Sequence, residues 1–341
     1  MVNCVLAMNI AEIARRANVS TATVSRTLNQ SGPVKAATAK KVWRAVTELN
    51  YYPNSHARAL VSGRSRLIGL IVSDITNPFF PELIEAFQGL AAQRQYDVLL
   101  TSTDYLTERM TECLRRMLER KVDGVAMMTS EMDMSLIKEL GKRNVPIVFM
   151  DVGQMGPRMS HVAIDYGNGI RQAVNHVVSL GHRHIAFISG PLDLHSARTR
   201  RQSFLDSMRH HGLTPDRKVV REGTHTAEGG EHAMAGLLKL SKPPTAVVCS
   251  NDWTAIGALH AAHGAGFRVP EDVSIVGFDD IPLAQYANPP LTTVQMTASD
   301  VGATAFNALF RLIGEEAVEG DVYQIPTQLI VRNSTGRPRR K

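Results

Sequence analysis

The stretch NIAEIARRANVSTATVSRTLNQ at residues 9–30 decides the architecture of the N-terminal part of the chain. Apolar residues recur in its first half at helical spacing, which predicts one short helix with a single packed face. A second short helix is expected from about Thr21 to Leu28. Between the two lies a three-residue turn that begins at Asn18, which suits the left-handed end of a helix, and ends at Ser20, which suits an N-cap. This pattern predicts a helix-turn-helix.

The second helix of a helix-turn-helix enters the major groove of DNA, and the outward residues expected on it here are small, hydroxylated or basic. Small residues at its start allow a close approach to base edges, Arg26 reaches a guanine in bidentate fashion, and Thr23 and Ser25 suit phosphates. The alternative, a helical hairpin inside an enzyme, does not account for this outward face. A third helix is expected at about residues 36–49, with its core face at Val42, Trp43, Val46 and Leu49.

Positive charge is concentrated in the same part of the chain. The formal net charge is +6, but residues 1–66 hold ten Lys and Arg against two Glu, a net of +8, and the remainder holds 28 basic against 30 acidic residues, a net of −2. Binding to phosphates requires concentrated positive charge, so this asymmetry favours a nucleic-acid-binding module attached to a nearly neutral body. On charge alone, a solvated helical surface is the alternative.

The motif VSTATVSRTLN at residues 19–29, together with ELNYYPNSHARAL at residues 48–60, resembles the DNA-binding headpiece and hinge of the lactose/galactose repressor (LacI/GalR) family. The similar stretch runs over about residues 9–335, and the two motifs are highly specific to the family. The start of translation stays open between Met1 and Met8, because the seven residues before Met8 exceed the short lead that is usual in this family.

The resemblance implies a hinge helix at about residues 54–60 that orders on operator DNA, with Leu60 wedged into the minor groove. An apolar wedge there unstacks one base step and bends the duplex, and the bend permits further contacts. Read without the resemblance, Leu60 is a core leucine. The DNA-contacting residues that we expect from the motif and the resemblance are Ser20, Thr21, Ala22, Thr23, Ser25, Arg26, Asn29, Tyr51, Asn54, Ala57, Arg58 and Leu60.

Apolar segments of strand length, each followed by a helical pattern, dominate the rest of the chain. Continuous apolar strands between helices predict parallel sheets covered on both faces, and seven such units predict two doubly wound lobes. The expected fold class is therefore α/β, with an all-α headpiece ahead of a two-lobed body. The candidate strands are 67–72, 97–100, 124–128, 146–150, 184–188, 245–249 and 273–277.

Polar and aromatic residues follow these strands at their carboxyl ends, where ligands bind in such sheets. Carboxylates, amides and guanidinium groups hydrogen-bond vicinal hydroxyls in pairs, and aromatic faces cover the apolar patches of a sugar ring, so the set predicts a polyol site. Each residue has a structural alternative: Asp252 would cap a helix starting at Trp253, and one of Phe79 and Phe80 would belong to the core.

The body also resembles the periplasmic sugar-binding-protein fold that the family uses as its effector domain. Matching the family pattern implies effector contacts at Asn77, Phe79, Phe80, Asp151, Arg200, Asn251 and Asp279, of which the first three resemble the ribose-binding branch. His225 falls where many members carry an aromatic residue that stacks on the ligand. This departure leaves the identity of the ligand open.

Enzyme signatures are weak, so we expect neither catalysis nor a cofactor. His182 and His184 suggest a metal, but the segment LGHRHIAFI around them resembles the ordinary strand entry of the family. Gly264 and Gly266 lack the third glycine and the preceding strand of a dinucleotide loop. No GxSxG, HExxH or P-loop motif nominates a nucleophile or a general base.

A sugar-binding protein for transport is the other alternative, and it would need export and no headpiece. The N-terminus has no credible signal peptide, and no apolar run approaches the roughly 18 residues of a membrane helix. Cys4, Cys113 and Cys249 are odd in number and widely spaced, which excludes a disulfide framework and fits reduced thiols. We therefore expect a cytoplasmic protein.

The domain boundaries follow from these patterns. We expect a headpiece at residues 1–62, which includes a hinge helix at about 54–62, and an effector-binding and dimerisation domain at residues 63–341. Within the latter, the expected N-lobe is 66–162 plus 292–324, and the expected C-lobe is 163–291 plus 325–336.

The expected function is sequence-specific repression of transcription under the control of a sugar or sugar derivative bound between the lobes. We predict a homodimer on a near-palindromic operator, because two-fold protein symmetry matches inverted DNA repeats. Residues 337–341 lack the apolar heptads of a tetramerising tail. Release from DNA by the sugar is favoured over co-repression, and the sign of the response stays open.

Overall fold

The computed structural model describes residues 10–29, 32–51, 64–129, 139–151, 156–214, 216–314 and 319–339. The chain divides into two compact units, residues 1–66 and residues 67–341. Among the described residues, no helix is both long enough and apolar enough to cross a membrane.

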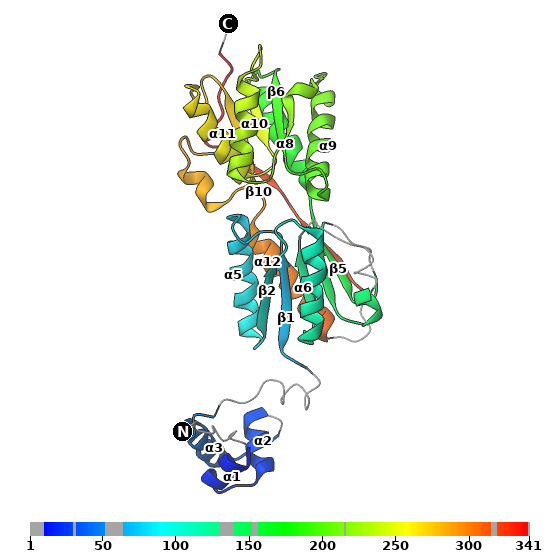
Figure 1. The fold of residues 1–341 in the computed structure, drawn as a ribbon, viewed down its shortest axis with the longest axis vertical. Coiled ribbons are helices and arrows are strands. Elements are labelled where there is room, and N and C mark those ends of the chain that lie inside the picture. Colours follow the sequence, from blue (N-terminus) through cyan, green and yellow to red (C-terminus); the bar gives the residue numbers. More distant parts are fainter. Residues whose placement is uncertain are drawn as a thin grey trace, which may run out of the picture. The chain divides into compact units, whose positions relative to one another are not determined.

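The described part of the N-terminal unit contains α1 (Ile10–Ala17), α2 (Thr21–Asn29) and α3 (Ala36–Glu48) (Figure 1). Its small core forms around Ile13, Val24 and Val42, which are fully buried, one from each helix. An exposed ion pair of 2.7 Å between Arg16 and Glu48 joins α1 to α3. The predicted helix-turn-helix and the third helix are confirmed, and their bounds lie within one residue of the expected ones.

One residue of α3 differs from its predicted position. Trp43 was expected in the core, but its side chain is 45% exposed, whereas Ala45 is buried. Consecutive residues of a helix are separated by about 100° around its axis. The buried face therefore follows Val42, Ala45, Val46 and the half-buried Leu49 at helical spacing, and Trp43 lies outside it.

The second unit begins with a lobe, called the N-lobe here, that is built on a six-stranded parallel sheet. Its elements are β1 (Leu67–Val72), α5 (Phe79–Gln93), β2 (Asp97–Ser102), α6 (Thr107–Glu119), β3 (Val125–Met128), β4 (Ile147–Met150), β5 (Met159–Ile164), α12 (Ala298–Gly314) and β11 (Val322–Ile325). The strand order is β11-β5-β4-β3-β1-β2. Leu70 and Phe87 belong to the core on the face covered by α5 and α12, and Ile71 and Met117 belong to the core under α6.

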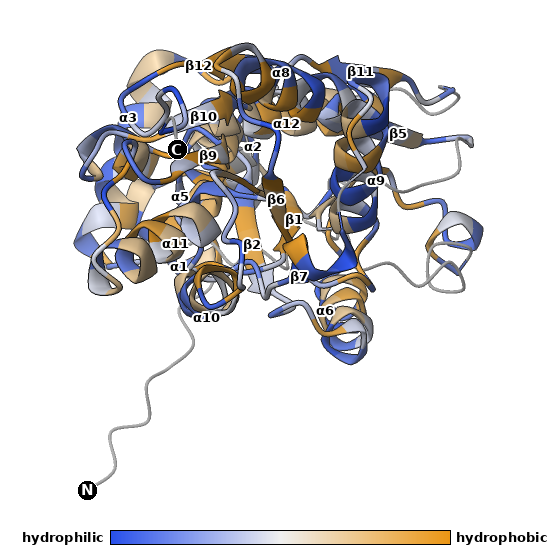
Figure 2. Ribbon diagram, turned by 90° about the horizontal axis from the view of Figure 1, so that it is seen from above, coloured by the Kyte–Doolittle hydropathy of each residue, from blue (hydrophilic) through white to orange (hydrophobic). Residues whose placement is uncertain are grey.

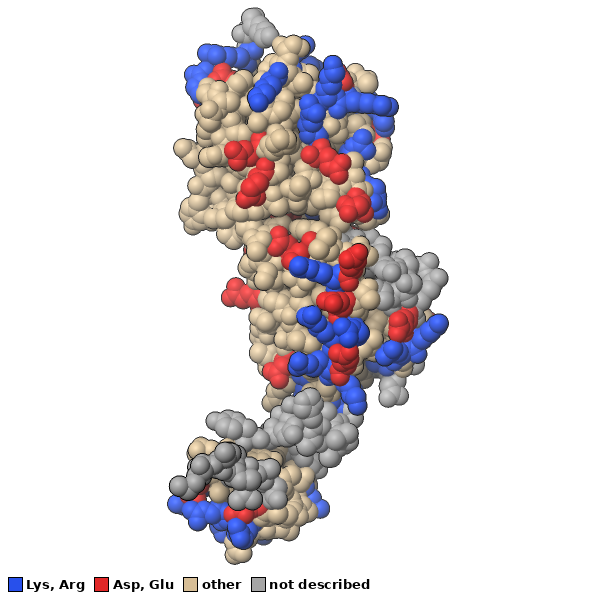
Figure 3. All heavy atoms as spheres, viewed as in Figure 1, with Lys and Arg blue, Asp and Glu red and all other residues tan. Residues whose placement is uncertain are grey.

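The outer surface of α6 carries alternating acidic and basic side chains (Figure 3). Arg116 lies 3.4 Å from Glu112 and Arg115 lies 3.2 Å from Glu119, all of them exposed. Exposed pairs of this kind contribute little stability, typically below about 1 kcal/mol. This part of the N-lobe is therefore an ordinary solvated helix surface, with both signs of charge mixed.

The C-lobe contains a second six-stranded sheet, in the order β12-β10-β9-β8-β6-β7. Its elements are α8 (Tyr166–Ser179), β6 (Ile185–Ser189), α9 (His195–His210), η1 (Arg217–Val219), β7 (Val220–Glu222), α10 (Ala227–Leu238), β8 (Ala246–Cys249), α11 (Asp252–Gly264), β9 (Ser274–Asp279), η2 (Pro282–Tyr286), β10 (Thr292–Gln295) and β12 (Gln328–Ile330). All pairs are parallel except β10 with β12. Strands β1 and β6 are coloured as hydrophobic in Figure 2, as expected for strands covered on both faces.

Helices of the C-lobe pack in pairs, α8 with α9 and α10 with α11. The second pair approaches closely at Gly257, where an added Cβ would lie 1.8 Å from the carbonyl oxygen of Ala227. Only glycine permits this distance between two helix backbones. The tight contact places the start of α11, and the residues just before it, beside the end of the sheet.

The chain crosses between the lobes three times, after β5, after β10 and after β11. The second N-lobe segment was expected to begin at residue 292, but β10 pairs with Val276–Asp279 of β9 and therefore belongs to the C-lobe. The crossing falls at residues 296–297, before α12. The first N-lobe segment was expected to end at about residue 162, and it continues to Ile164, the end of β5.

All seven strands predicted from the sequence are confirmed, and five others were missed. Four of the missed strands are only three or four residues long, and β7, β11 and β12 contain polar residues that break an apolar run. The fifth, β5, alternates between buried and partly exposed residues. Such strands are set by pairing with neighbours, which local composition does not reveal.

Candidate functional site

The turn between α1 and α2 has the predicted geometry. Asn18 has a φ of 51°, in the left-handed region, and ends α1. The Oγ atom of Ser20 accepts a hydrogen bond from the backbone N–H of Thr23 at 3.2 Å and thereby caps α2. Both local predictions are confirmed, and the capped turn fixes how the outer face of α2 is presented.

The predicted DNA-contacting residues that the structure describes lie at or near this face. The exposed ones are Ser20, Thr21, Ala22 and Arg26, and the half-buried ones are Thr23, Ser25 and Tyr51. Tyr51 packs against the core of the headpiece, so its aromatic ring also has a structural role. The side chain of Asn29, and all of Asn54, Ala57, Arg58 and Leu60, lie outside the described residues.

The second unit holds a cavity between its lobes, at the carboxyl ends of strands from both sheets. Seven predicted effector residues line the cavity, namely Asn77, Phe79, Phe80, Arg200, His225, Asn251 and Asp279. Seven further residues that we did not predict also line it, namely Ser73, Tyr105, Met150, Tyr166, Leu194, Ser196 and Met296.

Arg200 of α9 is buried, with 6% of its surface exposed, and several groups contact its guanidinium. Its Nη1 atom donates to the carbonyl oxygen of Ser250 at 2.5 Å, and its Nη2 atom lies 3.8 Å from Oδ1 of Asp279. The guanidinium also lies 4.3 Å from the ring centre of Tyr166 and 4.6 Å from that of Phe278. A buried carboxylate and two aromatic faces therefore balance this buried cation.

Asp279 ends β9 in a backbone conformation that non-glycine residues rarely adopt, with a φ of 116°. Asp280 follows with a φ of 58°. Each such residue costs on the order of 1–3 kcal/mol, so the surroundings must hold the pair in place. Burial raises the pKa of the Asp279 carboxyl to about 7, although Arg200 acts in the opposite direction. Removal from water thus outweighs the attraction of the guanidinium.

Asp151 does not line the cavity. It follows β4 with a φ of 63°, and its Oδ2 atom accepts a hydrogen bond of 2.5 Å from the hydroxyl of Tyr166. Tyr166, at the start of α8 in the C-lobe, does line the cavity. Burial raises the pKa of the Asp151 carboxyl to about 6. The structure therefore places Asp151 as a bridge from the N-lobe to a cavity residue of the C-lobe.

His225 follows β7 in a left-handed conformation, with a φ of 63°. Its ring packs against Gly190, where an added Cβ would lie 2.0 Å from Nε2. Burial lowers the pKa of His225 to about 3, so the ring is neutral at physiological pH. The ring of Tyr105, from the N-lobe, lies 6.0 Å away at an angle of 31°. A neutral aromatic pair thus meets across the two lobes.

The structural alternatives weighed for Asp252 and for the two phenylalanines have different outcomes. Asn251 accepts a hydrogen bond from the Thr254 N–H at 3.0 Å and is the cap of α11, so Asp252 is not. Phe79 and Phe80 are each 5% exposed, belong to the core and also line the cavity. Their rings pack edge to face, with centres 5.4 Å apart. For these rings, core packing and a role at the cavity coexist.

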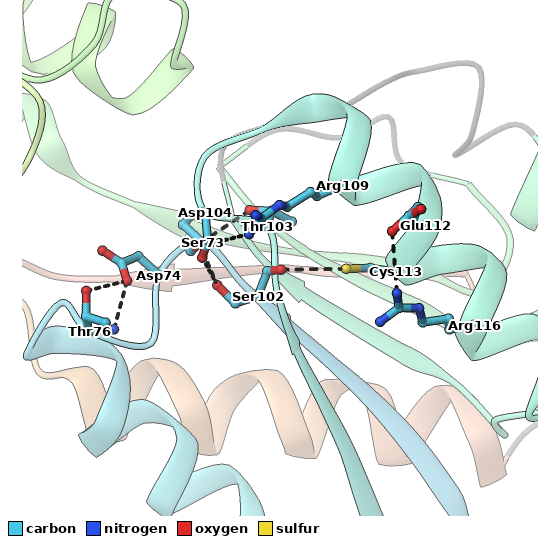
Figure 4. Close-up of polar contacts among 10 residues, drawn as sticks. All are labelled: Ser73, Asp74, Thr76, Ser102, Thr103, Asp104, Arg109, Glu112, Cys113 and Arg116. Carbon is cyan, nitrogen blue, oxygen red and sulfur yellow. Dashed lines mark hydrogen bonds and ion pairs between the residues drawn. The ribbon is translucent and has the colours of Figure 1, made fainter.

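The loop that carries Tyr105 is fixed by polar contacts at the ends of β1 and β2 (Figure 4). Asp104 and Tyr105 both have left-handed backbones, with φ values of 50° and 59°. The N–H of Asp104 donates to the carbonyl of Ser73 at 2.7 Å, the hydroxyl of Ser102 donates to the Asp104 carboxylate at 2.8 Å, and Arg109 pairs with the same carboxylate. These contacts hold the turn that directs Tyr105 to the cavity.

Asn77 positions the N-lobe wall of the cavity. Its side-chain oxygen accepts a hydrogen bond from the Phe79 N–H at 3.1 Å, at the start of α5. This bond leaves the amide NH2 of Asn77 as the group that can donate to a ligand. On the C-lobe wall, the side-chain amide of Asn251 donates to the carbonyl of His225 at 3.0 Å. Asn251 thereby fixes the strained His225 turn as well as α11.

Fold and site together define a class of protein. A basic helix-turn-helix unit, with small and hydroxylated residues on the exposed face of its second helix, has the features of a DNA reader. In the same chain, two doubly wound lobes enclose a polar and aromatic cavity suited to a small ligand. This combination is that of a DNA-binding regulator with a ligand-binding body.

Comparisons with known proteins identify the family. Residues 9–54 match the model of the bacterial regulatory proteins of the lacI family, and residues 174–335 match that of a periplasmic binding protein-like domain. The HTH-type transcriptional repressor PurR of Pasteurella multocida is 35% identical over 329 residues, which is 95% of this chain and 98% of that protein. The chain belongs to the LacI family of DNA-binding transcriptional regulators.

Solved structures agree with this assignment. The lac repressor dimer bound to operator and the anti-inducer ONPF has a TM-score of 0.86 and 31% identity, covering 96% of this chain and 99% of that one. A LacI family transcriptional regulator from Enterococcus faecium with bound ribose has a TM-score of 0.72 and 28% identity, covering 80% of this chain and 99% of that one.

Proposed function

We propose that this protein is a homodimeric repressor whose affinity for a near-palindromic operator is controlled by an uncharged sugar bound between the lobes. One observation carries the ligand class. In the same cavity, Oδ1 of Asp279 accepts no hydrogen bond and Nε of Arg200 donates none, among the contacts of the described residues. An acceptor and a donor left without partners in one cavity match a group that both donates and accepts, and neighbouring hydroxyls of a sugar do so.

The charge of the cavity supports an uncharged ligand over a phosphorylated one. Arg200 is the single Lys or Arg of the described cavity lining, and Asp279 already faces it at 3.8 Å. His225 is neutral, because burial lowers its pKa to about 3. A phosphate would therefore enter a buried site without a free cation, which is unfavourable.

The walls of the cavity also fit a sugar. Phe79, Phe80, Tyr105 and Tyr166 present aromatic surface, and apolar CH patches of a sugar ring pack against such faces. Asn77 and Asn251 add side-chain amides to the same lining. The ribose-bound regulator from Enterococcus faecium gives a precedent for a sugar in this fold at 28% identity.

The control of DNA binding follows from the two-lobed site. Cavity groups come from both lobes, so a ligand that bridges them would shift one lobe against the other, and lobe closure is a common two-state element. Linkage requires that the sugar changes operator affinity by the factor by which operator changes sugar affinity, typically about 5–150-fold. We favour release of the operator by the sugar over co-repression.

The headpiece and hinge would act as in the family. Ser20, Thr21, Ala22 and Arg26 are exposed on or beside α2 and would contact one half-site. The lac repressor structure, a dimer on operator, supports a dimer with two half-sites. Because the target is genomic DNA, we expect the protein in the cytoplasm.

Ligand screening tests the effector class. Thermal melting of the purified protein is measured with uncharged pentoses and hexoses and with their phosphate esters, since a ligand of the native state raises the melting temperature. We expect at least one uncharged sugar to raise it and its phosphate ester not to do so. Stabilisation by phosphate esters alone would overturn the proposed ligand class.

Two variants separate the sites. Asp279→Ala should abolish the response to the sugar and leave ligand-free operator binding near wild type, whereas Leu60→Ala should retain sugar binding and lose specific operator affinity. An Asp279→Ala protein that still responds with unchanged affinity would contradict the cavity assignment, and tight operator binding by Leu60→Ala would contradict the hinge.

Light scattering with operator present should show a dimer, and a monomer at micromolar concentration would refute the symmetry argument.

A further inference from the structure

The strained loop after β9 is fixed by a set of polar contacts among residues that do not line the cavity. Asp280, which follows Asp279, accepts hydrogen bonds from Nη2 of Arg332 at 2.6 Å and from Nε2 of Gln295 at 2.9 Å. The side chains of Asp280 and Arg332 are 10% and 20% exposed, so water competes weakly for this ion pair. The Nη1 atom of Arg332 donates to the carbonyl oxygen of Leu291 at 2.8 Å.

A second anchor lies on the other side of the loop. The fully buried carboxylate of Asp252 accepts a hydrogen bond from the Ile281 N–H at 2.9 Å and one from the Thr293 hydroxyl at 2.5 Å. The ion pair of Asp280 with Arg332 and the hydrogen bond of Ile281 to Asp252 therefore hold the two residues that directly follow Asp279. This arrangement explains how a non-glycine residue keeps a φ of 116°.

One partner of Asp280 lies where the chain crosses between the lobes. Gln295 is the last residue of β10, and the next residue, Met296, starts the crossing to the N-lobe and lines the cavity. The N–H of Met296 donates to the carbonyl of Asp279 at 3.2 Å. Arg332 follows β12, which the chain reaches from the N-lobe after β11. The crossing at Met296 is thus attached to the loop that holds Asp279, and Arg332 joins the same loop to the chain that follows β12.

We infer that Asp280, Arg332 and Gln295 form a positioning latch. The latch holds Asp279 in the conformation that faces the ligand, and it connects ligand binding at Asp279 to the crossing at Met296. Asp280 and Arg332 are positioning residues, because neither lines the cavity. The second part of this inference rests on the proposed function, in which a sugar binds at Asp279.

The test compares two latch variants with a matched control in the same lobe. Asp280→Asn and Arg332→Gln each remove one charge of the latch. Asp272→Asn removes the carboxylate that pairs with Arg268 at 2.9 Å outside the cavity and the loop. For each protein, the melting temperature, the sugar dissociation constant and the operator dissociation constant with and without sugar are measured.

We expect Asp280→Asn and Arg332→Gln to weaken sugar binding at least tenfold and to flatten the operator response, with ligand-free operator affinity within about twofold of wild type. The double variant should lose no more than the worse single variant, because both act through one ion pair. Asp272→Asn should match wild type in both constants. A lower melting temperature with unchanged sugar affinity and operator response would show that the pair is only structural, and would overturn the inference.

Amide hydrogen exchange without ligand gives a second readout. The Met296 amide should exchange at least tenfold faster in Asp280→Asn than in wild type, while the Val248 amide in the centre of β8 should be unchanged. Equal rates at Met296 would refute the latch. If no sugar binds the wild-type protein, the proposed function fails, and the exchange experiment still decides whether Asp280 holds the loop.

Discussion

Sugar affinity should fall when the pH drops from 7.5 to 6, and Asp279 supplies the reason. When ionised, its carboxylate offers both oxygens as acceptors to sugar hydroxyls and binds them more strongly than the protonated acid does, so a proton competes with the ligand. Burial raises the pKa of this carboxyl to about 7 in the free protein. The ionised fraction is then about three quarters at pH 7.5 and about one tenth at pH 6, which predicts a roughly eightfold loss of affinity.

The other ionisable groups near Asp279 do not account for this change. Arg200 stays charged, and His225 stays neutral because burial lowers its pKa to about 3. Burial raises the pKa of Tyr166 and keeps its hydroxyl protonated. Asp151, whose pKa burial raises to about 6, adds a further decline only near the acid end of the range. Burial raises the pKa of the Asp252 carboxyl, and this group does not line the cavity.

Isothermal titration between pH 6 and 8, in two buffers of different ionisation enthalpy, measures both the affinity and the protons released. Wild type should release close to one proton on binding near pH 6 and almost none at pH 8. Asp279→Asn should bind weakly with a flat profile, and Asp272→Asn should follow wild type. A wild-type affinity that does not change with pH, or a decline that persists in Asp279→Asn, would refute the role given to this carboxylate.

Three further outcomes follow from the packing and from the headpiece. Gly257→Ala should destabilise the second unit by roughly 3 kcal/mol or more, because the added Cβ would lie 1.8 Å from a carbonyl oxygen of α10. Gly236→Ala, which has open space around it, should stabilise the unit by roughly 0.5–1 kcal/mol. Denaturant melts compare the two variants, and equal effects would contradict the close approach of the helices. Arg26→Ala should cost about 1–3 kcal/mol on operator and relax the preference at one guanine, while Lys41→Ala should weaken all sequences by a smaller amount; equal losses of Arg26→Ala on operator and on random DNA would make Arg26 a phosphate contact. Ser20→Ala should lower headpiece stability by about 1 kcal/mol through loss of the α2 cap, and an unchanged melting curve would contradict that role.

Local patterns in the sequence were sufficient for the headpiece and for the seven apolar strands. The turn from Asn18 to Ser20 is a local feature, because a left-handed residue and a cap depend on neighbours within four positions. Three polar residues at or beyond the carboxyl ends of strands were also predictable as site residues, although Asp151, which follows β4, does not line the cavity. Asn77, Asn251 and Asp279 line the cavity because the carboxyl ends of parallel strands meet at one edge.

Tertiary structure decided which other residues reach the cavity. Tyr105 lines it because Asp104 and Tyr105 adopt left-handed backbones that are fixed by Ser73 on a different strand. Tyr166 lines the cavity and Asp151 does not. Their hydrogen bond forms only because the chain crosses between the lobes after β5 and brings the start of α8 to the end of β4. These positions depend on contacts between segments far apart in sequence, and composition or periodicity carries no signal for them.

The latch and the lobe boundary have the same origin. Asp280 and Arg332 are 52 residues apart and become partners only because β10 and β12 pair at the edge of the second sheet. The pairing of β10 with β9 places residues 292–295 in the C-lobe, four residues beyond the predicted boundary of about residue 292. Local sequence patterns specified the three N-terminal helices, seven of the strands and much of the chemistry at their ends, whereas sheet pairing and the lobe crossings, which bring distant residues together, set how Asp279 is held.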